Sequence, residues 1–206
     1  MILRPYQRTA ADFAALNPRC VLGMPMGTGK TLTTLTTLDN LTLFDGVFPA
    51  LVIAPLYVAK HTWPSEIRKW PHLKHLRVSA IVGNAKQRLA ALRTPADIYT
   101  TNYENLPWLV EQWERDWPYR TIVADECTRL KGFRTRQGTQ RAKALARVAW
   151  LSERFIGLSG TLSPNGLQDL WGQLWFIDRG KRLGAAYGAF EERWVQSIQI
   201  GPDPYA

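Results

Sequence analysis

The chain has 206 residues, of which 46% are hydrophobic and 21% charged, a composition typical of a globular domain with a sizeable core. It shows neither the run of about twenty apolar residues that a membrane span needs nor a secretory signal pattern. We therefore expect no membrane association and a cytoplasmic location, in a prokaryote or a phage-infected host. The net charge of +9 favours a polyanionic partner, and the cysteines, Cys20 and Cys127, are predicted to be buried and reduced.

Short apolar runs alternate with longer helical patterns, which predicts an α/β fold in which helices sandwich a mainly parallel sheet. In chain order, the expected strands cover residues 20–23, 51–54, 78–82, 97–101, 121–124 and 155–158. Ligands of such folds gather at the carboxyl ends of the strands, so the chemistry is expected there.

The last part of the chain departs from this alternation. Residues 176–206 lack the regular strand and helix pattern and close with Gly-Pro-Asp-Pro at 201–204, which is typical of a loop or linker. We therefore expect one lobe at residues 1–175 and, at residues 176–206, an extension that leads toward another domain.

The first expected strand leads into a glycine-rich turn, which a Thr-rich helical pattern follows. The turn, residues 24–31, reads Met-Pro-Met-Gly-Thr-Gly-Lys-Thr and ends like a P-loop, although Met24 stands where the strict pattern has glycine. Its glycines would turn backbone N–H groups toward a polyphosphate, and the positive end of the helix dipole would add to the attraction. Lys30 would then reach the β- and γ-phosphates, and the Thr31 hydroxyl would ligate Mg²⁺.

An acidic pair, Asp125 and Glu126, follows the fifth expected strand. Crowding two carboxylates is unfavourable unless a cation compensates them. Such a pair is also common in a solvated turn, but together with an upstream P-loop it favours a hydrolase. In that role Asp125 would hold Mg²⁺ and Glu126 would polarise the attacking water.

Basic residues without an acidic residue among them occupy the segment 129–147. They are Arg129, Lys131, Arg134, Arg136, Arg141, Lys143 and Arg147. A solvated helix face normally interleaves acidic residues, so the pattern favours contacts with a phosphate backbone over a plain solvated surface. We assign these contacts to Arg134 and Arg136.

Several segments occur in an order that resembles a known family. They are residues 3–7, 26–31, 51–56, 100–104, 125–128 and 158–162. In this order the chain resembles, over nearly its whole length, the N-terminal RecA-like lobe of superfamily-two helicases, most closely the Swi/Snf-like branch of double-stranded-DNA translocases. The resemblance implies a RecA-like P-loop fold, ATP and Mg²⁺ as cofactors, and double-stranded DNA as partner.

The resemblance also assigns a nucleotide site. The site would comprise Arg4, Tyr6, Gln7, Met26, Gly27, Thr28, Gly29, Lys30 and Thr31. Within it, Gln7 would read the adenine edge, and Arg4 and Tyr6 would flank the base. The plain alternative for Gln7 is that it simply begins the first helix.

Further family roles fall on Pro55 and Thr101, which would contact DNA, and on Ser159 and Thr161, which would link the acidic pair to that contact. The alternatives are ordinary strand-end residues and turn hydroxyls. Family members usually carry histidine at the fourth position of the acidic motif, where this chain has Thr128. A hydroxyl can donate a hydrogen bond but cannot carry the charge of imidazole, so the coupling of hydrolysis to DNA movement is in question.

Two other patterns receive structural interpretations. The tryptophans that lie among apolar residues at helical spacing, which favours core packing over base stacking, are Trp63, Trp70, Trp171 and Trp175. His72 and His75 have a metal-like spacing but lack a Cys or carboxylate partner set, so we expect no metal site there.

We expect the chain to be the ATP-binding lobe of a DNA-dependent ATPase, either a translocase or a strand-separating helicase. Such motors hydrolyse ATP between two RecA-like lobes, and no second α/β series follows residue 161. The isolated chain is therefore expected to bind ATP·Mg²⁺ weakly and to hydrolyse it slowly until a second lobe acts in cis or in trans. The alternatives are a DNA-binding or interaction module that kept the fold without the motor, and a small-molecule P-loop kinase.

Overall fold

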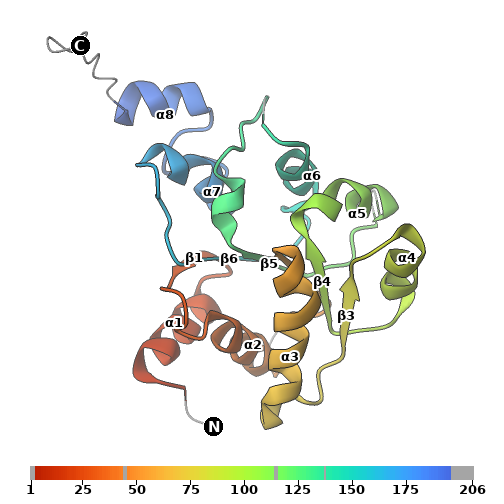
Figure 1. Cartoon of the computed structure of the whole chain (residues 1–206). Helices are drawn as coiled ribbons and strands as arrows, with labels where there is room; N and C mark the ends of the chain where they lie inside the picture. The colour runs from red at the N-terminus through yellow and green to blue at the C-terminus, as the bar shows by residue number, and fades with distance from the viewer. Residues whose placement is uncertain (1–2, 44–45, 114–115, 137, 196–206) are drawn as a thin grey trace, which may run out of the picture.

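The computed structural model describes residues 3–43, 46–113, 116–136 and 138–195. Its centre is a six-stranded sheet with the order β1-β6-β5-β2-β4-β3, in which every neighbouring pair is parallel (Figure 1). The strands are β1 Arg19–Gly23, β2 Ala50–Ala54, β3 Val78–Ile81, β4 Ile98–Asn102, β5 Thr121–Asp125 and β6 Arg154–Ser159. The predicted α/β fold is confirmed, and each predicted strand is present.

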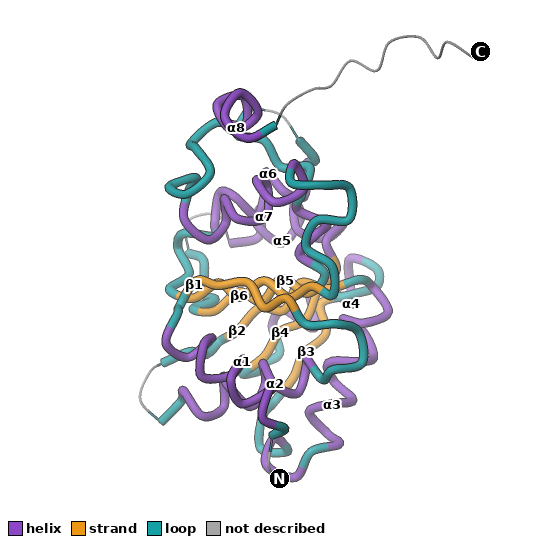
Figure 2. The backbone as a smooth tube through the Cα atoms, turned by 90° about the vertical axis from the view of Figure 1, so that its left-hand side faces the viewer, coloured by secondary structure: helices purple, strands orange, loops and turns teal. Residues whose placement is uncertain are grey.

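Helices cover both faces of this sheet, as Figure 2 shows from the side. One face carries α1 (Pro5–Leu16), α2 (Lys30–Leu41) and α3 (Trp63–Lys69), and the other carries α5 (Leu106–Trp113), α6 (Gln140–Val148) and α7 (Gln168–Asp178). The remaining helix of this part of the chain, α4 (Ala85–Arg93), packs against the edge strand β3. The central strands are buried on both faces, which explains their nearly continuous hydrophobicity.

The carboxyl ends of the strands bring distant parts of the sequence to one edge of the sheet. Because β1, β6 and β5 are neighbours, the turn after β1 lies beside the ends of β6 and β5. The Met24 N–H donates to the Ser159 carbonyl at 2.9 Å and ties this turn to the end of β6. Asp125 is the last residue of β5, so the predicted P-loop (residues 24–31, called the P-loop below) and the acidic pair share one edge, as expected for a parallel sheet.

After residue 176 the structure contains a helix in a region where the sequence indicates a loop or linker. This helix, α8, covers Tyr187–Trp194. Its Phe190 is only 2% exposed and packs in the same core cluster as Trp171 of α7. The lobe boundary between residues 175 and 176 stays a prediction, and the closing Gly-Pro-Asp-Pro lies outside the described residues.

Among the residues that the structure describes, none of the helices combines the length and the apolar character that a membrane span requires. Cys20 and Cys127 are buried free thiols, as predicted. Burial raises the pKa of Cys20 to about 11 and the pKa of Cys127 to about 12. Both thiols therefore stay protonated at neutral pH.

Gly172 of α7 lies against the backbone that follows the acidic pair. A Cβ at this position would lie 2.5 Å from the carbonyl oxygen of Leu130 and 2.7 Å from that of Lys131. Alanine stabilises a helix interior by roughly 1 kcal/mol over glycine, but overpacking against backbone costs about 1–3 kcal/mol. We expect Gly172→Ala to lower the free energy of unfolding, measured by urea denaturation, by about 1–2 kcal/mol.

The matched control is Gly188→Ala in α8, where a Cβ would meet no atom within 4 Å. This variant should be as stable as the parent or more stable, because only helix propensity changes. Equal effects of the two substitutions would contradict the close contact between α7 and the segment after β5.

Candidate active site

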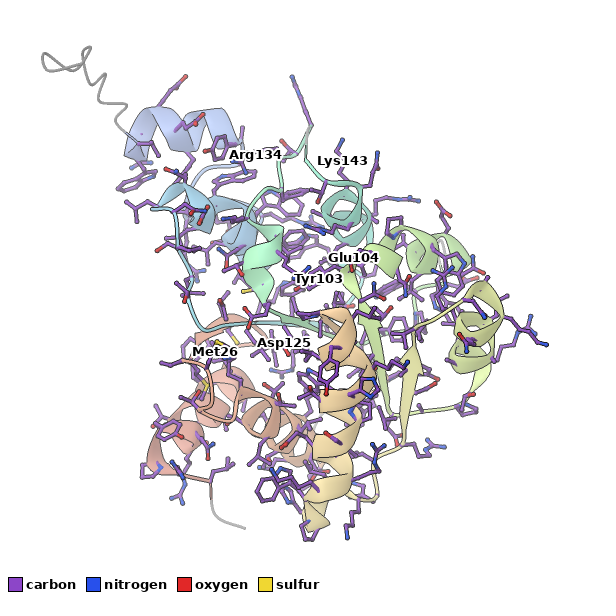
Figure 3. All side chains as sticks on the ribbon, viewed as in Figure 1. Met26, Tyr103, Glu104, Asp125, Arg134 and Lys143 are labelled. Atoms are coloured by element: carbon purple, nitrogen blue, oxygen red, sulfur yellow. The ribbon has the colours of Figure 1, made fainter. Side chains whose placement is uncertain are left out.

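A pocket of about 650 Å³ opens at the carboxyl ends of β1 and β5. Its size lies within the range of about 300–1,000 Å³ that is usual for small-molecule sites. All of the predicted nucleotide-binding residues line it, together with Asp125 and Glu126. Figure 3 labels Met26 of the P-loop and Asp125 at this edge of the sheet. The remaining wall includes residues outside the predicted nucleotide site, namely Thr62, Glu66, Lys69 and Trp70.

The P-loop has the backbone geometry that a phosphate cradle requires. Gly27 and Gly29 have φ of 77° and 81°, in the left-handed region that favours glycine. A Cβ at Gly27 would meet no atom within 4 Å, whereas one at Gly29 would lie 2.5 Å from Gln7 Nε2. α2 begins directly at Lys30 without a side-chain cap, so its first N–H groups are available to an anion.

Lys30 lies over the P-loop. Its ammonium Nζ donates to the carbonyl oxygens of Met24 at 3.0 Å and Pro25 at 3.3 Å. An ammonium has three N–H donors, so the same side chain can also bind a phosphate at the mouth of the turn. The cradle, the helix N-terminus and the ammonium together fit a polyphosphate.

The first turn of α1 is joined to the tip of the P-loop. Gln7 is 6% exposed; its Oε1 accepts from the Arg4 N–H at 3.0 Å, and its Nε2 donates to the Thr28 carbonyl at 2.8 Å. The Tyr6 hydroxyl donates to the same carbonyl at 3.3 Å. The structure therefore gives Gln7 a clear role in holding α1 on the P-loop. Adenine recognition by Gln7, Arg4 and Tyr6 stays a prediction.

The acidic pair is held by several contacts. Asp125 is 6% exposed, and its Oδ2 accepts from the Trp63 indole N–H at 2.9 Å. Burial, with the nearby charge of Glu126, raises the pKa of Asp125, while the Trp63 hydrogen bond and the charge of Lys30 oppose the rise. Glu126 has φ 56°, so the chain turns sharply at this residue. A cation beside Asp125 would compensate its buried charge.

Trp63 is the residue of this site that the sequence prediction underestimated. It is fully buried in the core, as predicted, but its indole N–H also holds the carboxylate of Asp125. Hydrophobic spacing in the sequence predicts which face of a helix is buried, but it does not show what a buried N–H meets.

The oxygen ligands of the pocket suit Mg²⁺, which also takes phosphate and water oxygens. They do not suit a metal that is bound by protein side chains alone. No group of three or more His, Cys, Asp or Glu side chains able to hold a metal occurs in the described part of the chain. Mg²⁺ typically takes one or two carboxylates together with phosphate oxygens and waters. The Thr31 hydroxyl and the Asp125 carboxylate, both at the pocket, meet this requirement.

Replacing Asp125 with asparagine is expected to stabilise the ligand-free chain at neutral pH. A carboxyl whose folded-state pKa is raised opposes folding as the pH rises from its ordinary pKa of 3.8 through the raised value. Asparagine removes this cost and can still accept from Trp63. Urea denaturation should therefore show a gain at about pH 7 that shrinks toward the ordinary Asp pKa. A loss of stability at both pH values would contradict the assignment of burial as the dominant influence.

Ser159 and Thr161 form a compact turn after β6. The Ser159 hydroxyl donates to the Thr161 carbonyl at 2.9 Å and accepts from the Thr161 N–H at 3.1 Å. Within residues 116–136 and 138–195, no hydrogen bond joins the Thr128 hydroxyl to this turn. The coupling roles of Thr128, Ser159 and Thr161 stay predictions.

A different contact joins the acidic motif to the segment after β6. The Cys127 thiol donates to Gln173 Oε1 at 3.4 Å, and Gln173 Nε2 donates to the Leu162 carbonyl at 2.7 Å. Gln173 lies on α7 and is 2% exposed. The sequence carries no signal for this link, because a single glutamine in an amphipathic helix has no motif.

The predicted strand-end contacts with DNA have internal partners. The Thr101 hydroxyl is buried and donates to the Ile81 carbonyl at 3.0 Å, which joins β4 to β3. The Pro55 carbonyl accepts from the Ala59 N–H at 2.9 Å and starts the helical segment after β2. These contacts are structural, and the DNA roles of Pro55 and Thr101 stay predictions.

Arg134 and Arg136 differ in the solvent exposure of their side chains. The Arg134 guanidinium lies 3.3 Å from the ring centre of Tyr187 in α8, and its Nη1 donates to the carbonyls of Lys131 and Phe133. Arg136 is exposed. Arg136 is thus the more accessible of the two for a phosphate group, and both DNA contacts stay predictions.

Known proteins are similar in sequence to this chain over most of its length. A model of the SNF2-related domain matches residues 6–197. Protein p41 of Acyrthosiphon pisum secondary endosymbiont phage 1 is 50% identical over 96% of this chain and 44% of its own length. Helicase SWR1 of Mycosarcoma maydis is 30% identical over 85% of this chain and 10% of its own length.

Solved structures agree with the fold described above. The Sulfolobus solfataricus SWI2/SNF2 ATPase core in complex with dsDNA matches with a TM-score of 0.80 and 28% identity, over 98% of this chain and 41% of that chain. The UvsW helicase of bacteriophage T4, with a TM-score of 0.63, 16% identity and 86% of this chain covered, supports the fold alone. The chain therefore spans less than half of the phage relative and of the Sulfolobus core. It belongs to the SNF2-related domain family, with the RecA-like fold of an SNF2 ATPase core lobe.

Proposed function

We propose that the chain binds and hydrolyses ATP as one lobe of a DNA-dependent ATPase that moves along double-stranded DNA. The observation that carries the proposal is the shared pocket, because Lys30, Asp125 and Glu126 all line it. The dsDNA in the similar Sulfolobus complex and the net charge of +9 support duplex DNA as the partner. The phage origin of p41 supports action in the cytoplasm of a prokaryotic or phage-infected cell.

Each residue of the pocket then has a defined task. Lys30 and the backbone N–H groups of the P-loop bind the β- and γ-phosphates. Thr31 and Asp125 hold Mg²⁺, which neutralises phosphate charge when bound. Glu126 accepts a hydrogen bond from the attacking water and takes its proton. Gln7 keeps α1 against the P-loop through the Thr28 carbonyl, so the adenine side of the site moves with the phosphate side.

A second RecA-like lobe, in cis or in trans, is part of this proposal. In motors of this kind, arginines from the second lobe stabilise the transferred phosphoryl group and are worth orders of magnitude in rate. The chain spans 41% of the Sulfolobus ATPase core, which supports a shared site between two lobes. We therefore expect slow turnover by the chain alone.

The test is phosphate release by the chain, with and without duplex DNA, after a candidate second lobe has been supplied. Stimulation by duplex DNA is the expected result. Salt-sensitive DNA binding with no stimulation would instead favour a DNA-binding module that kept the fold. Transfer of phosphate to an added small-molecule acceptor would favour the P-loop kinase.

The proposed phosphate contacts predict a change in the salt dependence of DNA binding. Each lost phosphate contact should lower the slope of log K against log[salt] by about one unit. Replacing Arg134 and Arg136 with glutamine is therefore expected to flatten the slope by up to about two units, with most of the change from the exposed Arg136. Arg93→Gln on α4 is the control for loss of one positive charge elsewhere. A slope equal to that of the control would indicate that these arginines belong to a solvated surface and do not contact DNA phosphates.

A further inference from the structure

The turn after β4, a short helical turn over Tyr103–Asn105, reaches across the sheet to the acidic pair. Tyr103 is fully buried, and its hydroxyl donates to the backbone carbonyl of Asp125 at 2.8 Å. β4 and β5 are not neighbours, because β2 lies between them. The Tyr103 side chain therefore extends past β2 to reach the backbone of the acidic motif. Figure 3 labels Tyr103 above Asp125.

The carbonyl that Tyr103 holds belongs to the peptide between Asp125 and Glu126. Glu126 has φ 56°, a left-handed conformation that costs roughly 1–2 kcal/mol for a residue with a Cβ. The next turn is closed by the Arg129 N–H, which donates to the Glu126 carbonyl at 3.0 Å. A hydrogen bond on each side of Glu126 thus fixes the backbone from which its carboxylate projects.

Burial keeps the Tyr103 hydroxyl protonated, so that it can donate a hydrogen bond. Its pKa is raised well above 10.0, first by burial and then by the nearby Cys127 and Asp125 groups. The hydroxyl therefore keeps its proton at neutral pH and remains able to donate to the Asp125 carbonyl.

Glu104, the next residue, holds two arginines of the basic segment. Its Oε1 lies 3.2 Å from Arg141 Nη1 of α6 and 3.6 Å from Arg129 Nη1 of the turn after Glu126. Its Oε2 accepts from Asn102 Nδ2 at 2.8 Å. The pKa of Glu104 is lowered, first by the Asn102 hydrogen bond and further by the two arginines, so the carboxylate is ionised. Glu104 and Arg129 are both exposed at the surface.

We infer that this turn positions the acidic pair and links it to phosphate binding: Tyr103 fixes the Asp125–Glu126 peptide, and Glu104 competes with DNA phosphates for Arg129 and Arg141. The second half rests on the proposed DNA-dependent function. Carboxylates and phosphates bind a guanidinium in the same way, so a phosphate at these arginines displaces Glu104. Arg129 is part of the same short helical turn as Cys127, and its N–H donates to the Glu126 carbonyl, so this arginine is joined to Glu126 through the backbone.

Tyr103→Phe tests the positioning half. Phenylalanine keeps the buried ring and removes only the hydrogen bond to Asp125. The matched control is Tyr99→Phe on β4, the strand before this turn; the Tyr99 hydroxyl donates to the Thr94 carbonyl at 2.9 Å and accepts from the Ala96 N–H at 3.1 Å. Hydrogen exchange of the amides at residues 126–133 should be about fivefold to tenfold faster in Tyr103→Phe than in Tyr99→Phe. Equal exchange in the two variants would overturn the positioning role, whether or not the chain hydrolyses ATP.

Steady-state kinetics of the DNA-stimulated enzyme give a second readout for Tyr103. A misplaced Glu126 lowers kcat and leaves KM for ATP unchanged, because the phosphate cradle is untouched. We expect about a tenfold loss of kcat in Tyr103→Phe and a kcat near the parent value in Tyr99→Phe. An equal loss in both variants, or a rise in KM alone, would overturn the role.

Glu104→Gln tests the competition half, with duplex DNA as the probe. Glutamine can still accept from Asn102 but no longer binds the arginines as an anion. The control is Glu111→Gln on α5, which makes the same change of net charge at another exposed position. We expect Glu104→Gln to bind duplex DNA about threefold to tenfold tighter than the control at low salt. Equal affinities would overturn the competition, and absence of DNA binding by the parent chain would instead overturn the proposed function.

Discussion

Lys30→Ala is expected to lower the affinity for ATP·Mg²⁺ by at least about 30-fold, because removing one partner of a desolvated charge pair costs about 2 kcal/mol or more. The side chain lies over the P-loop through the Met24 and Pro25 carbonyls and lines the pocket. The rest of the cradle is backbone, so the fold of the variant should be retained. Binding of a fluorescent ATP analogue, with circular dichroism as the check of folding, measures the effect.

Lys86→Ala on the exposed surface of α4 is the control for this experiment. It removes the same charge at a distance from the pocket and should leave nucleotide affinity unchanged. Equal affinities of the Lys30 and Lys86 variants would remove Lys30 from the nucleotide site.

Glu126→Gln should spare ATP binding and lower turnover in the two-lobed enzyme by about 10²–10⁴-fold, the usual contribution of a general base. Glutamine suits this test because it keeps the size of the side chain and the backbone conformation with φ 56°. Phosphate release under single-turnover conditions measures the chemical step directly.

The substitution also has a readout that does not depend on turnover. The charge of Glu126 helps to raise the pKa of Asp125, so Glu126→Gln should lower that pKa. Mg²⁺-dependent nucleotide binding should then persist to a lower pH than in the parent, because the metal requires the ionised carboxylate. Glu192→Gln on α8 serves as the control for both measurements. Normal turnover in Glu126→Gln would contradict the role of Glu126 with the attacking water.

The sheet could be predicted from the sequence because its strands are buried on both faces. Continuous apolar runs such as residues 51–54 and 121–124 are typical of strands that are covered by helices on both faces of a sheet. The shared edge of the P-loop and the acidic pair followed from the parallel arrangement. Helix α8 was less predictable, because few apolar residues, chiefly Phe190 and Tyr187, attach it to the core.

The contacts within the site could not be predicted, because a sequence pattern does not identify the partner of a buried polar group. Trp63, Tyr103 and Gln173 each lie in segments that pack in the core, yet each donates a hydrogen bond to the acidic motif or to the segment after β6. Their apolar or amphipathic surroundings predict burial alone.

The ion pairs of the basic segment, residues 129–147, also could not be predicted from the sequence. Residues 129–147 contain no acidic residue, but the fold brings Glu104 to Arg129 and Asp169 to Lys131. Linear spacing describes charges on one element, whereas ion pairs join different elements. The accessible positive charge is therefore smaller than the sequence alone indicates.

The most direct test of the account is the position of the metal–nucleotide complex, measured by NMR with Mn²⁺ in place of Mg²⁺. The Trp63 indole N–H lies 2.9 Å from Asp125 Oδ2, so bound Mn²⁺·ATP at this carboxylate should broaden its signal beyond detection. The indole signals of Trp150 and Trp175, which belong to the core on the opposite face of the sheet, should persist as internal controls. Saturating Mn²⁺·ATP that leaves the Trp63 signal intact would contradict a shared pocket for Lys30, Asp125 and Glu126.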